Sequence, residues 1–178
     1  MALHEQSCGT TDEWYTPAYV FDALGEQFDL DVSHPGREFA PWTPAEQLIT
    51  ADSLTKPWSG FVWMNPPFGG RNALVPWLAK FFEHGDGIAL VPDRTSAPWW
   101  QQFAPRADVV LFVDGKIRFI GRDGRPGTSP AQGTTLLAVG QRGAAALLRA
   151  ASAGLGSAWV SRPQAKALVS PLTSEEGA

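Results

Sequence analysis

The sequence contains one cysteine, Cys8, in 178 residues, so an internal disulfide is excluded. That scarcity fits a reducing compartment. No run approaches about 18 consecutive apolar residues, and no membrane span is therefore expected. The first residues also lack the basic start and the apolar run of a signal peptide. Together these absences predict a cytoplasmic protein.

Histidine is scarce as well, which limits the chemistry available to the chain. His4, His34 and His84 are isolated from one another, and Cys8 has no partner at the spacing of a metal site. No Ser-His-Asp set and no phosphate-binding loop stand out. The sequence therefore predicts no metal site.

The net charge of −4 hides an asymmetry along the chain. Residues 1–56 carry ten acids and two bases (2 − 10 = −8), whereas residues 57–178 carry eight acids and twelve bases (12 − 8 = +4). An acidic first third joined to a basic remainder is compatible with one basic face that binds nucleic acid. Ordinary charge scatter accounts for the same numbers equally well.

A helix is predicted shortly after the N-terminus. Val20, Phe21 and Leu24 are apolar residues at helical spacing. Thr16 suits the N-cap, and Pro17 suits the first helical position, where a fixed φ and a missing N–H are tolerated.

Helices and strands alternate along the chain as far as residue 113. Two more strands are expected at 115–121 and 133–140, joined by a polar loop rich in glycine and proline. This order predicts an α/β fold with a mostly parallel sheet and an antiparallel C-terminal hairpin. The remaining expectations are a loop over 34–47, one domain over 11–161, an N-terminal arm at 1–10 and a flexible tail at 162–178.

Polar residues follow three of the predicted strands at the point where each strand ends. The segments are FDLDVSH, FVWMNPPF and ALVPDRTS. In parallel α/β sheets, ligands bind beyond the carboxyl ends of the strands. We therefore expect the binding site at this edge of the sheet.

The second segment contains Asn65-Pro66-Pro67-Phe68. The two prolines lack N–H groups and hold the loop extended. The loop thus offers two fixed acceptors, the Asn65 side-chain oxygen and the Pro66 carbonyl, while the Asn65 amide nitrogen remains free to be anchored elsewhere. Phe68 adds a flat ring on which a base could stack. This set fits a planar group that carries an NH₂; the alternative is a rigid strand exit with a core phenylalanine.

These four residues resemble the [Asn/Asp/Ser]-Pro-Pro-[Tyr/Phe] motif of S-adenosylmethionine-dependent amino-methyltransferases. More of the chain, from about Thr11 to Val139, resembles the phage-type DNA N-6-adenine methyltransferase (Dam-like) family. The matching segments, in order, are DEWYTPAYVFDALGEQFDLDVS, ADSLTKPWSGFVWMNPPF, ALVPDRTSAPWWQQF and VVLFVDGKIRF. The resemblance implies a Rossmann-like methyltransferase fold, S-adenosylmethionine as cofactor, double-stranded DNA as partner, and a bacterial cell or phage-infected host cell as location.

The resemblance also assigns roles to individual residues. Asn65 and Pro66 would bind the target amino group, and Phe68 would stack on the base. Asp31 or Asp29 would bind the cofactor's ammonium or ribose hydroxyls. The catalytic set is Asn65, Pro66, Pro67 and Phe68; the cofactor set is Trp14, Thr16, Pro17, Asp29, Asp31, Asp52 and Asn65; the substrate set is Phe68, Arg94, Ser96, Lys116 and Arg118.

Some of these residues have a simpler explanation, and one expected feature is missing. Thr16 could merely cap a helix, and Asp52 could merely cap a loop. Lys116 and Arg118 belong to a basic stretch that could contact the DNA backbone or simply be solvated. The broader methyltransferase class has a glycine-rich turn after its first strand, whereas this chain has DVSHPGREF with a single glycine, Gly36.

The resemblance predicts direct methyl transfer from S-adenosylmethionine to the N6 amino group of adenine in DNA. The target base must leave the stack to reach the loop, which requires base flipping. Two alternatives stay open from the sequence: an amino-methyltransferase that acts on RNA or on a protein glutamine, and an inactive relative that binds cofactor or DNA. The recognised DNA sequence and the oligomeric state are not encoded in any pattern found here.

Overall fold

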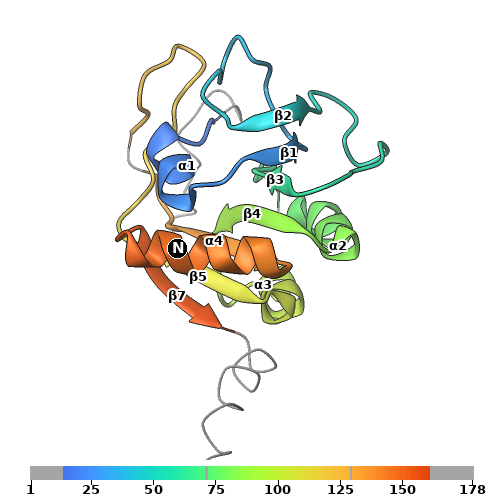
Figure 1. Cartoon of the computed structure of the whole chain (residues 1–178), viewed down its shortest axis with the longest axis vertical. Helices are drawn as coiled ribbons and strands as arrows, with labels where there is room; N and C mark the ends of the chain where they lie inside the picture. Colours follow the sequence, from blue (N-terminus) through green and yellow to red (C-terminus); the bar gives the residue numbers. More distant parts are fainter. Residues whose placement is uncertain (1–13, 71, 129, 161–178) are drawn as a thin grey trace, which may run out of the picture.

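The computed structural model describes residues 14–70, 72–128 and 130–160, so the predicted arm at 1–10 and tail at 162–178 lie outside the described residues. At its centre is a seven-stranded sheet with helices on both faces (Figure 1). The strands are β1 (Phe28–Asp31), β2 (Ala45–Leu48), β3 (Val62–Met64), β4 (Gly87–Pro92), β5 (Val109–Val113), β6 (Thr134–Val139) and β7 (Gly156–Val160). The helices are α1 (Ala18–Leu24), α2 (Leu74–His84), α3 (Pro98–Phe103), α4 (Gln141–Ser152) and the 3₁₀ turn η1 (Ala104–Arg106).

The strand order is β2-β1-β3-β4-β6-β5-β7. β1 pairs in parallel with β2 and β3, and β3 pairs in parallel with β4. β6 lies between β4 and β5 and is antiparallel to both, and β7 is antiparallel to β5. β1 to β5 therefore run in one direction, which agrees with the predicted mostly parallel α/β sheet.

The C-terminal hairpin is not the predicted one. Residues 115–121 form no strand: Ile117 and Phe119 are buried in the core, and Ile120 makes only isolated bridges to Tyr15 and Pro126. The second predicted strand exists as β6, but it pairs with β4 and β5. The apolar residues of 115–121 are buried as part of a loop. A buried segment does not have to form the backbone hydrogen bonds of a strand.

Two edge strands carry too weak a signal to be predicted from the sequence. β2 overlaps the end of the segment 34–47 expected to be loop, and in it Glu46 and Gln47 are exposed while only Ala45 is buried. β7 alternates between exposed and half-buried residues, and Trp159 is 67% exposed. An edge strand buries little side-chain surface, so its pairing leaves a faint mark on the sequence.

Two hydrophobic clusters fill the faces of the sheet. On one face α1 and α4 pack against β-strand residues that include Trp63, Ile88 and Leu111. On the other face α2 and α3 pack against residues that include Met64 and Val91. Figure 1 shows α1 and α4 together on the near side. The central strands are therefore covered on both faces, and their carboxyl ends remain for binding.

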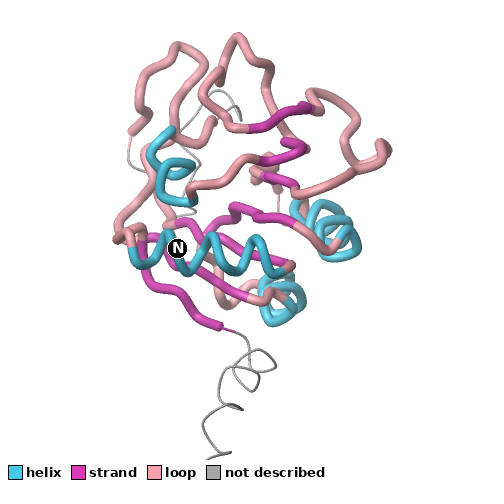
Figure 2. Tube along the Cα trace, viewed as in Figure 1, coloured by secondary structure: helices cyan, strands magenta, loops and turns pink. Residues whose placement is uncertain are grey.

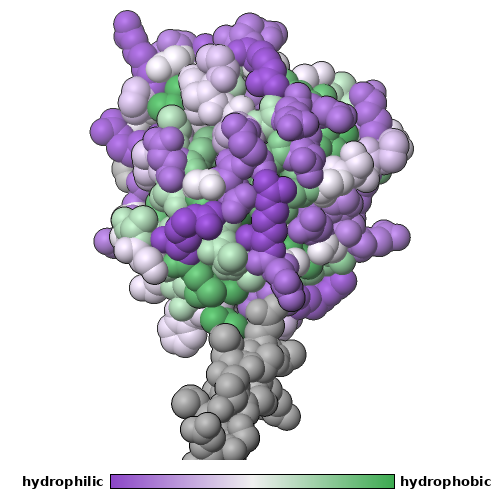
Figure 3. Space-filling model, viewed as in Figure 1, coloured by the Kyte–Doolittle hydropathy of each residue, from purple (hydrophilic) through white to green (hydrophobic). Residues whose placement is uncertain are grey.

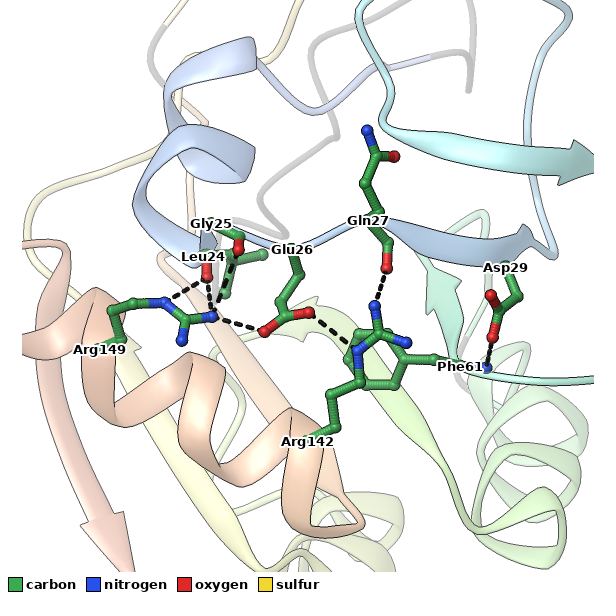
Figure 4. Close-up of polar contacts among 8 residues, drawn as sticks. All are labelled: Leu24, Gly25, Glu26, Gln27, Asp29, Phe61, Arg142 and Arg149. Carbon is green, nitrogen blue, oxygen red and sulfur yellow. Dashed lines mark hydrogen bonds and ion pairs between the residues drawn. The ribbon is translucent and has the colours of Figure 1, made fainter.

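Arginines of α4 hold the turn that leads into β1 (Figure 4). Arg149 donates to the carbonyl of Leu24 at 2.6 Å and to the Glu26 carboxylate at 2.6 Å. Arg142 donates to the other oxygen of Glu26 at 2.9 Å and lies over the Phe61 ring at 4.4 Å. These contacts fix where β1 begins.

The longest connections gather at one end of the molecule (Figure 2). The β1–β2 connection and the β5–β6 connection meet there, because the Arg122 guanidinium lies 4.6 Å from the centre of the Phe39 ring. The viewed surface of this end is mainly hydrophilic, whereas hydrophobic residues gather near β7 (Figure 3). Over the described ranges, none of the helices has the length and apolar character to cross a bilayer.

Candidate active site

The carboxyl ends of β1 and β3 are joined by hydrogen bonds through Ser33. The Ser33 N–H donates to the Asp31 carboxylate at 2.9 Å, and the Ser33 hydroxyl oxygen accepts the Asn65 N–H at 3.0 Å. A single residue, Ser33, therefore connects the candidate cofactor acid Asp31 to the candidate catalytic loop. Ser33 was missed by sequence reasoning, because its partner lies 32 positions away.

The Asn65 side chain is held by its nitrogen. Nδ2 donates to the Thr16 hydroxyl oxygen at 3.2 Å and to the Trp14 carbonyl at 3.3 Å. Since a backbone carbonyl can only accept, the nitrogen and not the oxygen must face Trp14. No described residue donates to Oδ1 of Asn65 or to the Pro66 carbonyl. Within the described part of the chain, both acceptors of the loop are therefore without a donor.

The rest of the loop combines a rigid backbone with one aromatic ring. Pro66 is buried and Pro67 is exposed. Phe68 is half-buried where the two hydrophobic clusters meet, and its ring packs edge-on against Phe119 with centroids 6.4 Å apart. One part of the Phe68 ring is thus anchored, and another part is accessible.

Thr16 does not cap α1, contrary to the prediction. The N-cap position is Pro17, and it has no side-chain cap hydrogen bond. Thr16 is 5% exposed and its hydroxyl faces Asn65, while its carbonyl accepts the Trp42 indole N–H at 2.8 Å. The hydroxyl that would satisfy a cap instead accepts a hydrogen bond from the side chain of Asn65, in the candidate catalytic loop.

Replacing Thr16 with valine should lower the turnover number about tenfold, because one hydrogen bond that orients the Asn65 amide is lost. Thr16→Ser keeps the hydroxyl and should retain most activity. Steady-state methylation assays on the two variants give the comparison. A loss of unfolding free energy with an unchanged turnover number would show that Thr16 serves only the fold.

Asp31 is a buried carboxyl with one partner. It is 4% exposed and accepts only the Ser33 N–H among the described residues. Burial raises the pKa of Asp31 to about 7, and the Ser33 N–H opposes that shift. A buried acid with most of its acceptor capacity unused fits a ligand that brings an ammonium or hydroxyl group.

Asp29 is already engaged elsewhere. Its carboxylate accepts the Phe61 N–H at 2.6 Å, at the entry to β3 (Figure 4). A side chain on Gly60 would collide with that carboxylate, since a Cβ there would lie 2.2 Å from Oδ2. Asp29 therefore contacts the chain just before β3, whereas Asp31 lies at the carboxyl end of β1, where Ser33 links it to the loop after β3.

A buried histidine organises the loop that stands in place of a glycine-rich turn. His34 is 2% exposed; its Nδ1 accepts the Gly36 N–H at 2.9 Å, and its Nε2 donates to the Ala40 carbonyl at 3.2 Å. Both contacts require the neutral ring with the proton on Nε2. Burial lowers the pKa of His34. No motif in the sequence indicates this role of His34, because it depends on the burial of the ring in the folded chain.

Acidification should destabilise the protein through His34. The unfolded state binds the proton near pH 6.5 and the folded state binds it at lower pH, so the His34 contribution to the free energy of unfolding is lost as pH falls below about 6.5. Asp31 titrates nearby with the opposite sign. Urea denaturation of the wild type and of His34→Asn between pH 8 and 5 separates the two, and parallel curves would contradict the prediction.

A comparison of the whole sequence adds to this geometry. A family model described as DNA N-6-adenine-methyltransferase (Dam) matches residues 5–143. The chain belongs to the Dam family. This membership confirms the resemblance drawn from the sequence and implies adenine N6 methylation of DNA as the general activity, with S-adenosylmethionine as the general methyl donor. Searches of curated proteins and of solved structures gave no match.

In this Dam-family protein the residues predicted to bind substrate lie on two exposed segments. Arg94 follows β4 and donates to the Gln132 side chain at 2.7 Å, and Ser96 is exposed close to it in the chain. Lys116 and Arg118 are exposed and donate to carbonyls of their own loop, those of Ala131 and Gly127. Arg94, Lys116 and Arg118 are therefore held by hydrogen bonds to nearby loop residues, and none of these bonds is to Asn65.

Trp14 links this loop to the site. Its carbonyl accepts from Asn65, and its ring lies against Gly127, where an added Cβ would clash with the ring. The adjacent Tyr15 pairs with Ile120 through two backbone hydrogen bonds of 2.9 Å. The segment that orients Asn65 is thus also the support of the basic loop of this Dam-family protein.

Asp52, the remaining candidate, lies in the connection from β2 to β3. It is exposed and has a φ of 55°, a left-handed conformation that no other described non-glycine residue adopts. Its carbonyl accepts the N–H and the hydroxyl of Thr55. In the described part of the chain, no group of three or more His, Cys, Asp or Glu side chains could hold a metal ion.

Proposed function

We propose that this Dam-family protein transfers a methyl group from S-adenosylmethionine to the N6 amino group of adenine in DNA, by direct in-line attack on a flipped base. One observation carries the proposal: the Asn65 amide is fixed by its nitrogen, so that its oxygen and the Pro66 carbonyl are left as acceptors. Two rigid acceptors suit an NH₂ group, which has two hydrogens to donate.

The loop would prepare the amino nitrogen for attack. The lone pair of this nitrogen is delocalised into the base, which makes it a poor nucleophile. Accepting both hydrogens in a fixed geometry favours a more tetrahedral nitrogen with an available lone pair, while Phe68 stacks on the base. After methylation the nitrogen is positively charged and acidic, so it loses a proton to water, and no general base is needed beforehand.

The methyl donor fits the end of β1. The buried and nearly unpartnered Asp31 would accept hydrogen bonds from its ammonium or ribose hydroxyls. When bound, S-adenosylmethionine supplies an electrophilic methyl group on a sulfonium sulfur. Trp14, Thr16, Pro17 and Asp52 complete the proposed cofactor contacts, and Arg94, Ser96, Lys116 and Arg118 the proposed DNA contacts.

The topology supports the same location and a Rossmann-like reading of the fold. β1 continues to β2 on one side, whereas β3 continues to β4 on the other side. The connections therefore diverge between β1 and β3, and this is the switch point at which open α/β sheets bind ligands. Asp31 ends β1, and Asn65 directly follows β3.

The test is a transfer assay with labelled S-adenosylmethionine on DNA, RNA and protein extract. We expect label in DNA only, and nuclease digestion should release it as N6-methyladenine. Label in RNA or in protein glutamine would show that DNA is not the substrate and would refute this part of the proposal. Cofactor binding by calorimetry without label in any substrate would identify an inactive relative.

A further inference from the structure

We propose that Lys80 of α2 is a positioning residue for the methyl donor, because it holds the 52–56 loop that presents Asp52. The inference rests on the proposed function, since it concerns how that site keeps its cofactor. Lys80 belongs to no motif in the sequence and lies 28 positions after Asp52, so only the fold brings it to this loop.

The Lys80 ammonium is enclosed by backbone carbonyls of the loop. Nζ donates to the carbonyl oxygens of Ser53 at 2.8 Å, Leu54 at 3.1 Å and Lys56 at 2.5 Å. An ammonium has three hydrogens, and three acceptors match them. Three carbonyls from four consecutive residues can converge on one point only if the loop curls around it, so the ammonium sets the shape of the loop.

Trp58 closes the same arrangement from the other side. Its ring centre lies 4.7 Å from Nζ of Lys80, within the range of a cation–π contact. Its indole N–H donates to both the carbonyl and the hydroxyl oxygen of Ser53 at 3.1 Å. Ser53 is buried, although its neighbours in the loop are exposed. The residue that follows Asp52 is thus fixed by two side chains at once.

Asp52 is the residue that this clamp presents. Its φ of 55° lies in the left-handed region, which aspartate adopts more readily than most residues with a side chain, and its carbonyl accepts the Thr55 N–H in a tight turn. Its carboxylate forms no hydrogen bond or ion pair with any described residue. An exposed acid that stands on a fixed turn and has no hydrogen bond to a described residue is available for a ligand contact.

The loop also leaves the sheet beside the proposed cofactor acid. Immediately after β2, the Ile49 N–H donates to the Asp31 carbonyl at 2.9 Å, and the Ile49 carbonyl accepts the His34 N–H at 3.1 Å. Asp52 comes three residues later. The acid at the end of β1 and the acid on the clamped loop therefore belong to the same edge of the sheet.

The inference is tested with Lys80→Met, which keeps the aliphatic chain on Trp58 and removes the ammonium. Lys56→Met is the matched control: it removes an exposed lysine of the same loop, whose carbonyl is retained. By calorimetry, Lys80→Met should weaken S-adenosylmethionine binding about tenfold, and Lys56→Met should leave it unchanged. In an Asp52→Ala background the additional effect of Lys80→Met should disappear.

Equal cofactor affinities for Lys80→Met and Lys56→Met would overturn the inference. So would an equal loss of cofactor affinity from Lys80→Met in the wild-type and the Asp52→Ala backgrounds. Hydrogen exchange of the Thr55 amide, which donates to the Asp52 carbonyl, gives a readout that needs no cofactor. It should accelerate in Lys80→Met only, and unchanged exchange would refute the clamp. A wild-type protein that binds no S-adenosylmethionine, with normal Thr55 protection, would instead refute the proposed function.

Discussion

Replacing Asn65 with alanine should lower methyl transfer to DNA by about 10²- to 10³-fold, the range expected when one preorganised polar group at a reacting centre is removed. The affinity for S-adenosylmethionine should change little. The alanine variant loses an acceptor for the amino group, and it also releases the contacts to Thr16 and Trp14 that fix the loop. Single-turnover kinetics together with calorimetry measures the two effects separately.

A neighbouring asparagine provides the control for this variant. Asn72 is exposed, and its side chain contacts no described group, so Asn72→Ala should be fully active. Asn65→Asp tests the orientation argument more sharply. It keeps an acceptor for the base but turns a carboxylate oxygen toward the Trp14 carbonyl, and the repulsion should leave intermediate activity. Full activity of Asn65→Ala would refute the proposed role.

The rigid, acceptor-rich character of the Asn65–Phe68 loop could be predicted because it depends on local properties. Two prolines after a buried strand fix the backbone of Asn65 and Pro66 and remove donors, whatever the rest of the fold does. What holds the amide could not be predicted. The sequence offers Thr16 both as a helix cap and as a site residue, and only the contact across 49 positions decides between them.

In the sheet, too, the features that depend on neighbouring residues could be predicted, and those that depend on distant residues could not. Strands buried on both faces, such as β4, are continuous apolar runs and were predicted correctly. The position of β6 between β4 and β5 could not be derived, because the residues of a strand do not specify which neighbouring strands it pairs with. The exposed edge strand β2 was missed for the related reason that it buries almost nothing.

The choice between Asp29 and Asp31 also depended on tertiary structure. Their spacing of two residues places both on one face of a strand, and the sequence cannot rank them. The structure separates them by position, because Asp29 accepts the Phe61 N–H just before β3, whereas Asp31 lies at the carboxyl end of β1, beside the loop that follows β3. A buried acid with a raised pKa and one hydrogen bond costs the unliganded fold stability, and perturbed acids of this kind cluster at functional sites.

That cost leads to the second large effect, which concerns Asp31→Asn. At pH 8 this variant should bind S-adenosylmethionine about tenfold to a hundredfold more weakly, because a charged acceptor becomes neutral. In the wild type, affinity should rise with pH up to about 7, the pKa of Asp31, since the free protein must release a proton before the ionised acid can accept from the ligand. Calorimetry between pH 5.5 and 8 should show this slope in the wild type and a flat profile in Asp31→Asn.

The same substitution should stabilise the unliganded protein above pH 7. The folded-state pKa of Asp31 is raised above the unfolded value near 4, so the folded state binds more protons between these values and loses stability as pH rises through the window. An asparagine can still accept the Ser33 N–H and has no charge to bury. Urea denaturation at pH 8 should therefore show Asp31→Asn to be more stable than the wild type while it binds the methyl donor less well. A variant that is both less stable and normal in binding would mean that Asp31 serves the fold and not the ligand.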